Sequence, residues 1–370
     1  MELTNDRNAL IDKVTIYDFT VTEIDDIAKL QKSGNLVVKD GSDYYIYTES
    51  GKKYSTISIT ADDIIDEFTF SIGINGDVYG CMSLSVPDDG YHNLNCLTAK
   101  QYLDIICNAQ LRLISEYGIY TDFSNAKYKR IEINKTIVIN GDFAEYQRPL
   151  TLMMFLLPGK LRLKGECDYS TKDKSNRQKA TDYKRSIMTY HKTSGERGLT
   201  IKIYDKRKQL QEEYDIKANH NYLRYEITLN APAKIRQCLE TNEVFFLEDE
   251  AIQNFFGEFI NDNILIPYRE NKKKRDVALT KILKSNYKAA DRKWVERVLL
   301  EISNYELENR GIPLMLDVNE LIPLLGKLKL SSRQNRSHYK NRFLQDTEKY
   351  SPVFTRRDDI KYLELIEKLL

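Results

Sequence analysis

Residues 186–230 read SIMTYHKTSGERGLTIKIYDKRKQLQEEYDIKANHNYLRYEITLN, and this stretch decides the fold. It predicts three strands, at 186–193, 199–205 and 222–229, because apolar or β-branched residues alternate there with polar ones. The segment 194–198 contains two glycines and predicts a hairpin turn between the first two strands. Side chains alternate between the faces of a strand, so each strand has an apolar and a polar face. The polar set is Thr200, Lys202, Tyr204, Lys206, Arg224, Glu226 and Thr228.

An earlier strand, predicted at 129–139, repeats this pattern. Ile131 and Ile133 oppose a polar set made of Arg130, Glu132 and Asn134. If these strands share one sheet, its polar face could hold a divalent metal and a phosphate beside a tyrosine. A second interpretation stays open, because antiparallel sheets often expose one polar face to water and tyrosine is a good strand former.

The remaining pattern predicts an α+β fold. The turn at 75–77, Asn-Gly-Asp, predicts a hairpin, and Thr98 predicts the start of a helix that ends at Gly118. We therefore expect an antiparallel-rich central sheet with helices on one face, and an opposite face open to a long substrate. We assign this domain to residues 1–230.

After Asn230 the pattern becomes helical. Helices are predicted at 247–261, after Asp291 and at 358–370, and a basic run at 271–275 follows Pro267. A mainly α-helical domain, which could bind DNA or a partner, is therefore expected over 231–370.

The composition limits the functional classes. The 370 residues carry 56 Lys and Arg against 55 Asp and Glu, so any surface for nucleic acid must be local. The five cysteines form no CxxC pair, which argues against a zinc site or a disulfide framework and suits a reducing cytoplasm. The longest apolar run, 150–157, is too short to span a bilayer. We expect a cytoplasmic protein without a membrane role.

Two further segments are locally basic. Residues 172–185 hold six basic and two acidic residues, and read either as a solvated loop or as an arm that follows a phosphate backbone. Residues 327–343 hold six basic residues and no acid, and read either as a solvated helix face or as a DNA contact. For the second segment we predict DNA contact by Arg333, Arg336, Lys340 and Arg342.

Three short motifs carry a family resemblance. Arg130-Ile131-Glu132, Ile203-Tyr204-Asp205-Lys206 and Leu223-Arg224-Tyr225-Glu226-Ile227 occur in this order, and Gly90-Tyr91-His92-Asn93 precedes the first helix. Over about residues 83–229, this ordered set resembles the gene II family of filamentous-phage replication initiators, with related plasmid initiators. These are rolling-circle nicking enzymes of the HUH type.

The resemblance implies a specific chemistry. Tyr204 matches the nucleophile, which would attack one DNA strand, form a 5′-phosphotyrosine link and leave a free 3′-hydroxyl for a host polymerase. A tyrosine has a pKa of about 10, so it needs a metal or nearby cations to react. Lys206 matches a lysine that would stabilise phosphate or phenolate. The resemblance implies two partners, a host helicase and single-stranded or supercoiled origin DNA. It also implies a location in the bacterial cytoplasm and is compatible with an oligomer.

The same resemblance suggests the metal and DNA ligands. Glu132 and Glu226 match acidic positions and are the expected metal ligands, with Asn134 as a third. Arg130 and Arg224 would orient those carboxylates or hold DNA, and Lys202 lies on the same polar face as a further DNA contact.

One feature of the wider superfamily is absent from the sequence. Its members bind metal with two histidines that flank a hydrophobic residue, and no such triplet occurs here. Carboxylates must then supply most ligands, which favours Mg²⁺ or Mn²⁺. His191 remains an alternative ligand and Tyr190 a rival nucleophile; Tyr204 is preferred because Lys206 is predicted on its own face.

Other functions remain open. A non-catalytic initiator or regulator that binds an origin would show the same polar face. An RNA-binding or tRNA-processing protein would fit an open sheet with many tyrosines. A transposase or a conjugative relaxase would share the nicking chemistry.

Overall fold

The computed structural model forms two compact units. The first comprises Met1–Val138 and Lys160–Phe256, and the second comprises Ile139–Gly159 and Gly257–Leu370. These bounds differ from the expected division at residue 230. The described residues are 8–24, 36–39, 46–47, 53–54, 56–60, 65–72, 78–85, 94, 96–146, 149–150, 153, 161–166, 187–192, 198–287, 293–308, 325, 337–339, 341–343 and 356–370.

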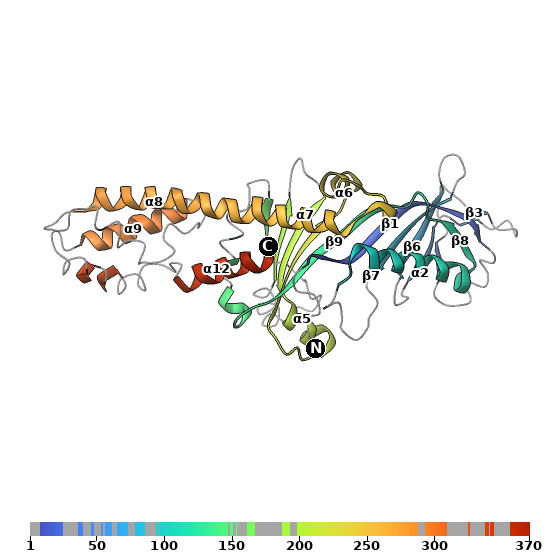
Figure 1. Cartoon of the computed structure of the whole chain (residues 1–370), viewed down its shortest axis with the longest axis horizontal. Helices are drawn as coiled ribbons and strands as arrows, with labels where there is room; N and C mark the ends of the chain where they lie inside the picture. Colours follow the sequence, from blue (N-terminus) through green and yellow to red (C-terminus); the bar gives the residue numbers. More distant parts are fainter. Residues whose placement is uncertain are drawn as a thin grey trace. The chain divides into compact units, whose positions relative to one another are not determined.

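The first unit is built on one antiparallel sheet of eleven strands (Figure 1). Its order is β10-β11-β12-β13-β9-β1-β7-β6-β5-β2, with β8 paired to β1. Its strands are β1 Leu10–Ile24, β2 Leu36–Lys39, β5 Thr56–Thr60, β6 Ile65–Ile72, β7 Val78–Ser85, β8 Ile119–Asp122, β9 Lys127–Val138, β10 Leu161–Glu166, β11 Ile187–Lys192, β12 Leu199–Asp205 and β13 Tyr222–Leu229. A separate pair comprises β3 Ile46–Tyr47 and β4 Lys53–Tyr54.

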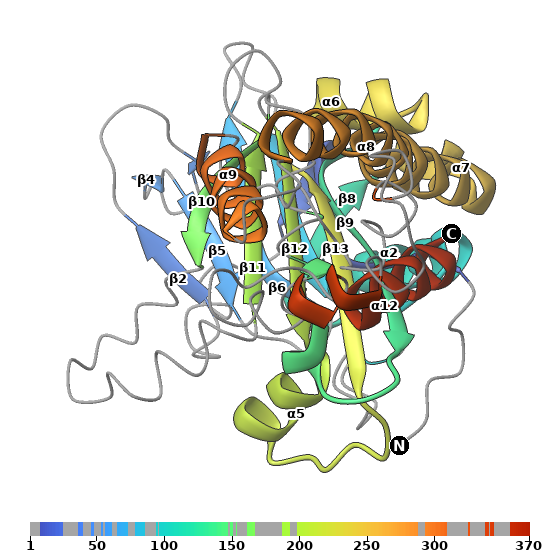
Figure 2. The ribbon, with the colours of Figure 1, turned by 90° about the vertical axis from the view of Figure 1, so that its left-hand side faces the viewer.

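The predicted strands of the central stretch are confirmed. Strands β11, β12, β13 and β9 lie side by side, as Figure 2 shows. Their register places Tyr204 opposite Arg224, and Lys202 opposite Glu226. Glu226 in turn lies opposite Asn134 on β9. The α+β class with an antiparallel sheet is therefore confirmed.

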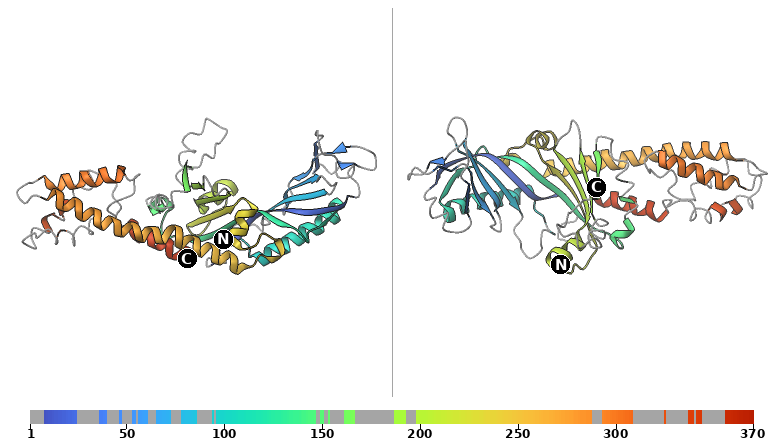
Figure 3. Two further views of the ribbon diagram at one scale, coloured as in Figure 1. Left: turned by 90° about the horizontal axis from the view of Figure 1, so that it is seen from above. Right: turned by 180° about the vertical axis from the view of Figure 1, so that it is seen from behind.

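The first helix follows the prediction closely. Helix α2, Ala99–Tyr117, begins at a capping box in which the Thr98 and Gln101 side chains each bond the other's backbone N–H. Gly118 ends the helix with a φ of 60°, a left-handed conformation that glycine adopts at little cost. The helix packs along β1 and β8, where it is teal in Figure 3.

Three further helices belong wholly or partly to the first unit. They are α5 Lys206–Tyr214, α6 Pro232–Leu239 and α7 Asp249–Ile260, with a 3₁₀ turn, η3, at Val244–Phe246. The predicted helix at 247–261 is confirmed by α7. The apolar face of the sheet includes Ile131, Ile133 and Tyr225, and the Tyr225 ring meets Phe256 of α7 edge to face at 5.9 Å.

The second unit is helical in its described part. It contains the 3₁₀ turn η1 Phe143–Tyr146, the π-helical turn η4 Asn261–Leu265, α8 Ile266–Asn286, α9 Trp294–Glu308 and α12 Arg356–Leu369. Fully buried Trp294 lies in a core with Leu279 and Leu283 of α8. Lys361 of α12 pairs with Glu145 at 3.0 Å and lies over the Tyr146 ring, which fixes η1 to α12. No helix of the described residues is long and apolar enough to cross a membrane.

Candidate metal centre

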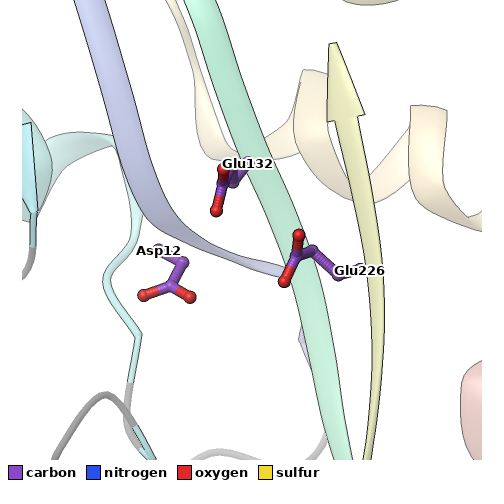
Figure 4. Close-up of side chains that lie close together, drawn as sticks. All are labelled: Asp12, Glu132 and Glu226. Carbon is purple, nitrogen blue, oxygen red and sulfur yellow. The ribbon is translucent and has the colours of Figure 1, made fainter. Parts of the chain in front are cut away.

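Three carboxylates from three adjacent strands meet on the polar face of the sheet. They belong to Asp12 of β1, Glu132 of β9 and Glu226 of β13, and all three are buried (Figure 4). One oxygen from each lies within 4.8 Å of the others. Oxygen ligands at this spacing are the type that Mg²⁺ and Mn²⁺ prefer.

Asp12 reaches this cluster through a β-bulge. On β1, Ile11 lies opposite Ile133, but Lys13 lies opposite Glu132, so Asp12 is the extra residue. A bulge of this kind re-aims a side chain, and here it places the Asp12 carboxylate beside Glu132. Asp12 was not predicted as a ligand; in the sequence it is only a lone acid in the stretch ALIDKVTI, residues 9–16.

Each of the three carboxylates has a basic partner. Asp12 accepts a hydrogen bond from Arg224 at 3.1 Å, and Glu226 accepts one from Lys202 at 2.7 Å. Glu132 pairs with Arg130. Of the predicted DNA-contact residues, Lys202 and Arg130 are partly exposed, with side-chain exposures of 26% and 39%. They therefore orient carboxylates and can still reach a ligand.

Arg224 differs from these two cations because it is fully buried. Its guanidinium also donates to the Thr136 hydroxyl at 2.9 Å and to the Leu94 carbonyl at 3.3 Å. Burial alone would lower the pKa of Arg224, but the negative charges around it, including Asp12, raise it overall. In this conformation Arg224 is buried and its guanidinium holds the Asp12 carboxylate in place.

Tyr204 lies on the same polar face, next to Arg224 on the neighbouring strand. Its side chain is 7% exposed. Burial raises the pKa of Tyr204 well above 10, and the positive charge of Arg224 offsets part of that rise. A cation that stabilises the phenolate is thus in place, although the hydroxyl is shielded from solvent.

Lys206 does not continue the polar face of β12, where we predicted its side chain. Strand β12 ends at Asp205, whose side chain caps α5 by accepting a hydrogen bond from the Lys208 amide at 2.9 Å. Lys206 is the first residue of that helix, is buried, and donates to Gln209 at 3.0 Å. The chain turns into a helix because Asp205 can supply this N-cap.

The polar face is covered here, contrary to the expectation of an open surface. Besides the Arg224 contact with Leu94, the Asn134 amide donates to the Cys96 thiol at 3.1 Å. Leu97 and Ile11 exchange two backbone hydrogen bonds, of 2.7 and 3.0 Å. Leu94, Cys96 and Leu97 therefore lie over the cluster, and we name these three residues the covering segment.

Asn134 lies beside the carboxylates, but its amide nitrogen is used by Cys96. The third oxygen donor that the geometry offers is Asp12, so Asn134 as third ligand stays a prediction from sequence alone. Burial raises the pKa of Cys96 to about 12, which keeps the thiol protonated.

Within the carboxylate cluster, the charged form of Glu132 is disfavoured despite the nearby cations. Burial, followed by the nearby Glu226 carboxylate, raises the pKa of Glu132 from 4.5 to about 7, even though Lys202 and Arg130 act against this rise. Among the described residues, Asp12 Oδ1 is buried without a hydrogen-bond partner. A buried unpaired carboxylate oxygen is costly, so a cation bound there would satisfy it. The donor set fits Mg²⁺ or Mn²⁺.

The register also bears on the two alternatives at β11. Tyr190 pairs with Ile201 of the apolar face, whereas His191 pairs with Thr200 of the polar face. The preference for Tyr204 over Tyr190 stays a prediction. In the C-terminal region, Arg342 lies 4.0 Å from Glu296 of α9. Arg333, Arg336 and Lys340 lie outside the described residues.

A scan against models of known protein families and a search of curated proteins found no match to this chain.

Proposed function

We propose that this chain initiates rolling-circle DNA replication. It would nick one strand at a specific site and form a 5′-phosphotyrosine link through Tyr204. The first unit would be an HUH-like nuclease domain in which carboxylates replace the histidines, and the helical second unit would bind DNA or a partner. The phage and plasmid initiators that the motifs resemble supply this hypothesis.

One observation carries the proposal: a tyrosine shares a polar sheet face with three clustered carboxylates and three cations. The carboxylates come from β1, β9 and β13, and the tyrosine comes from β12, next to β13. A fold that needed only a core has no use for this many buried charges, because each is costly to desolvate. A metal site and cations can together stabilise the phosphate during phosphodiester transfer to a tyrosine.

The roles of the residues follow from their positions. Asp12, Glu132 and Glu226 would hold the metal, which would polarise the scissile phosphate when bound. Lys202 and Arg130, being partly exposed, would move from their carboxylates to the phosphate oxygens.

The phosphodiester would be transferred to Tyr204 in one step. The Tyr204 oxygen attacks phosphorus and the bond from phosphorus to the 3′-oxygen breaks. The phenol gives up its proton to solvent and the leaving oxygen takes one up from solvent to become the 3′-hydroxyl, so no net proton is gained or lost. Arg224 would favour loss of the phenol proton by stabilising the phenolate.

Substrate access requires a change at the covering segment. Tyr204 is 7% exposed, so a DNA strand would reach its hydroxyl only if residues that cover the polar face moved. The contacts that would have to break include the Arg224 bond to Leu94, the Asn134 bond to Cys96 and the bridge between Leu97 and Ile11. Leu94 would also have to leave its buried packing against Leu210 and Tyr222. We propose that DNA binding displaces this segment.

A denaturing gel tests the proposal. Labelled single-stranded oligonucleotides that cover a candidate origin are incubated with the protein and Mn²⁺ or EDTA. The proposal predicts a metal-dependent covalent adduct that disappears in Tyr204→Phe, a variant that should still bind DNA. If Tyr204→Phe forms the adduct as the wild type does, Tyr204 is not the nucleophile.

A second function, a non-catalytic initiator that binds an origin, is favoured by a different observation. Every carboxylate of the cluster has a basic partner and Tyr204 is buried, so the network could serve stability alone. Such a binder would keep full replication activity in Tyr204→Phe and would form no adduct on any strand.

A further inference from the structure

Helix α8, Ile266–Asn286, carries a concentrated positive charge. Its 21 residues include seven basic residues and two acidic ones, whereas the whole chain has a net charge of only +1. The basic residues are Arg269, Lys272, Lys273, Lys274, Arg275, Lys281 and Lys284. The charge of this helix is therefore a local feature of the kind that marks a surface for a polyanion.

Five of the seven basic residues lie on one side of the helix, which also carries the exposed acid Glu270. At 100° per residue, the exposed residues Arg269, Lys273, Lys274, Lys281 and Lys284 fall within a sector of about 140°. The buried residues Tyr268, Arg275, Leu279 and Leu283 fall on the opposite side. We name the five exposed residues the basic stripe. From its first to its last residue the stripe spans about 22 Å at 1.5 Å per residue.

The basic stripe lacks the ion pairs that other helices of this chain have. Arg112 pairs with Glu116 on α2, Lys208 with Glu212 on α5, and Lys368 with Glu364 on α12, each four residues apart. Within the described part of the chain, no carboxylate lies within ion-pair distance of a stripe residue. These cations are available to an external anion.

Repulsion between like charges of the basic stripe weakens helix α8. Arg269 and Lys273 are like charges four residues apart, and Lys281 and Lys284 are three apart, an arrangement that weakens a helix. Val277 is 71% exposed between them. A helix that only had to be soluble would be better served by alternating charges.

We infer that the basic stripe of α8 binds the phosphate backbone of duplex DNA. A straight stripe of about 22 Å covers about six phosphates of one strand, since these are spaced 3.4 Å apart along the duplex axis. A membrane surface is disfavoured, because a helix that inserts must expose its apolar face, and α8 buries that face against α9 and Tyr362. The choice of DNA over another polyanion rests on the proposed function.

Salt-dependent binding by the full-length protein tests the inference. Fluorescence anisotropy with a labelled duplex of unrelated sequence is measured in EDTA, where no metal-dependent nicking takes place. The test variant combines Lys273→Gln, Lys281→Gln and Lys284→Gln. The control combines Lys100→Gln, Lys217→Gln and Lys234→Gln, which remove the same charge from the first unit.

The expected result is a loss specific to the stripe. The test variant should bind the duplex at least about tenfold more weakly at low salt, and the slope of log K against log salt should become shallower by about 2 to 3. The control should change the slope by less than about 1. Equal slopes for wild type and test variant would overturn the inference. The inference would also be overturned if the test variant lost binding to an acidic protein but bound DNA as the wild type does.

Failure of this inference is separable from failure of the proposed function. The anisotropy measurement does not involve Tyr204, and the covalent adduct can be measured on a short single strand. If the adduct forms but the salt slope of duplex binding is the same in wild type and test variant, only the inference about the basic stripe is overturned. If the slope changes but no adduct forms, DNA binding by the basic stripe is supported and only the proposed nicking activity is contradicted.

Discussion

Arg224 and Asp12 form an ion pair of 3.1 Å that joins β13 to β1 across the intervening strand β9. The guanidinium is fully buried, and the side chain of Asp12 is 12% exposed. This pair connects the strand next to Tyr204 with the carboxylate that sequence analysis missed. It therefore links the stability of the sheet to the geometry of the candidate metal centre.

The first prediction concerns this pair. Asp12→Asn should destabilise the protein by about 3 kcal/mol, because it leaves the buried guanidinium of Arg224 without its carboxylate. Asp18→Asn is the matched control: Asp18 pairs with Lys127 at 2.6 Å, but both side chains are about one-third exposed, so the loss should stay below about 1 kcal/mol. Urea unfolding of both variants measures the difference. Equal losses would show that the Arg224 pair is not a buried bridge.

The second prediction concerns the metal ligands. Mn²⁺ should raise the thermal midpoint of the wild type, since a ligand that binds only the folded state stabilises it. Glu226→Gln and Glu132→Gln should remove most of this rise, whereas the exposed-site control Glu248→Gln should keep it. Asn134→Ala should also keep it if Asp12 is the third ligand. A midpoint that Mn²⁺ leaves unchanged in the wild type would argue for a purely structural ion-pair network.

The third prediction follows from the raised pKa of Glu132, which is about 7 in the folded protein. Because the pKa of Glu132 is higher in the folded than in the unfolded protein, the folded state binds the Glu132 proton more tightly. The stabilisation from this proton is complete below about pH 4.5 and is lost as the pH rises through 7. Glu132→Gln mimics the protonated form. In EDTA its stability relative to the wild type should therefore increase from pH 5 to pH 8, by up to about 3 kcal/mol.

The same titration sets the pH dependence of metal binding. Below pH 7 a metal must displace the Glu132 proton, so the Mn²⁺-induced rise in midpoint should be smaller at pH 6 than at pH 8. A larger rise at pH 6 would show that Glu132 is not a ligand.

The fourth prediction concerns the covering segment. The Cys96 thiol is buried with a pKa of about 12, so it should react slowly with a thiol reagent, while exposed Cys107 reacts at once and serves as the internal control. Binding of a single strand with Mn²⁺ should accelerate labelling of Cys96, because the segment must move. Mass spectrometry of labelled peptides gives both rates. Cys96 labelling that DNA leaves unchanged would contradict displacement of the segment.

The sequence predicted those parts of the fold that depend on local pattern. Alternation located β9, β12 and β13, and the residue types of Thr98 and Gly118 located the ends of α2. These features need no knowledge of distant residues, since strand faces and helix caps follow from neighbours in the chain.

The parts that sequence analysis missed depend on long-range contacts. Asp12 joins the carboxylates only because a bulge in β1 shifts its register against β9. Lys206 was misplaced because Asp205 caps a helix instead of continuing the strand. The covering segment closes the polar face through bonds to Arg224 and Asn134, and no pattern within residues 94–97 signals these contacts.

Mapping the covalent adduct tests the central claim most directly. The wild-type protein is incubated with an origin-bearing single strand and Mn²⁺, the adduct is digested with protease and nuclease, and the modified peptide is sequenced by mass spectrometry. The account predicts a nucleotide linked through phosphate to Tyr204, and no such peptide when Mn²⁺ is replaced by EDTA. Modification of Tyr190 would keep the reaction but move it to the opposite face of the sheet, and would contradict the site described here.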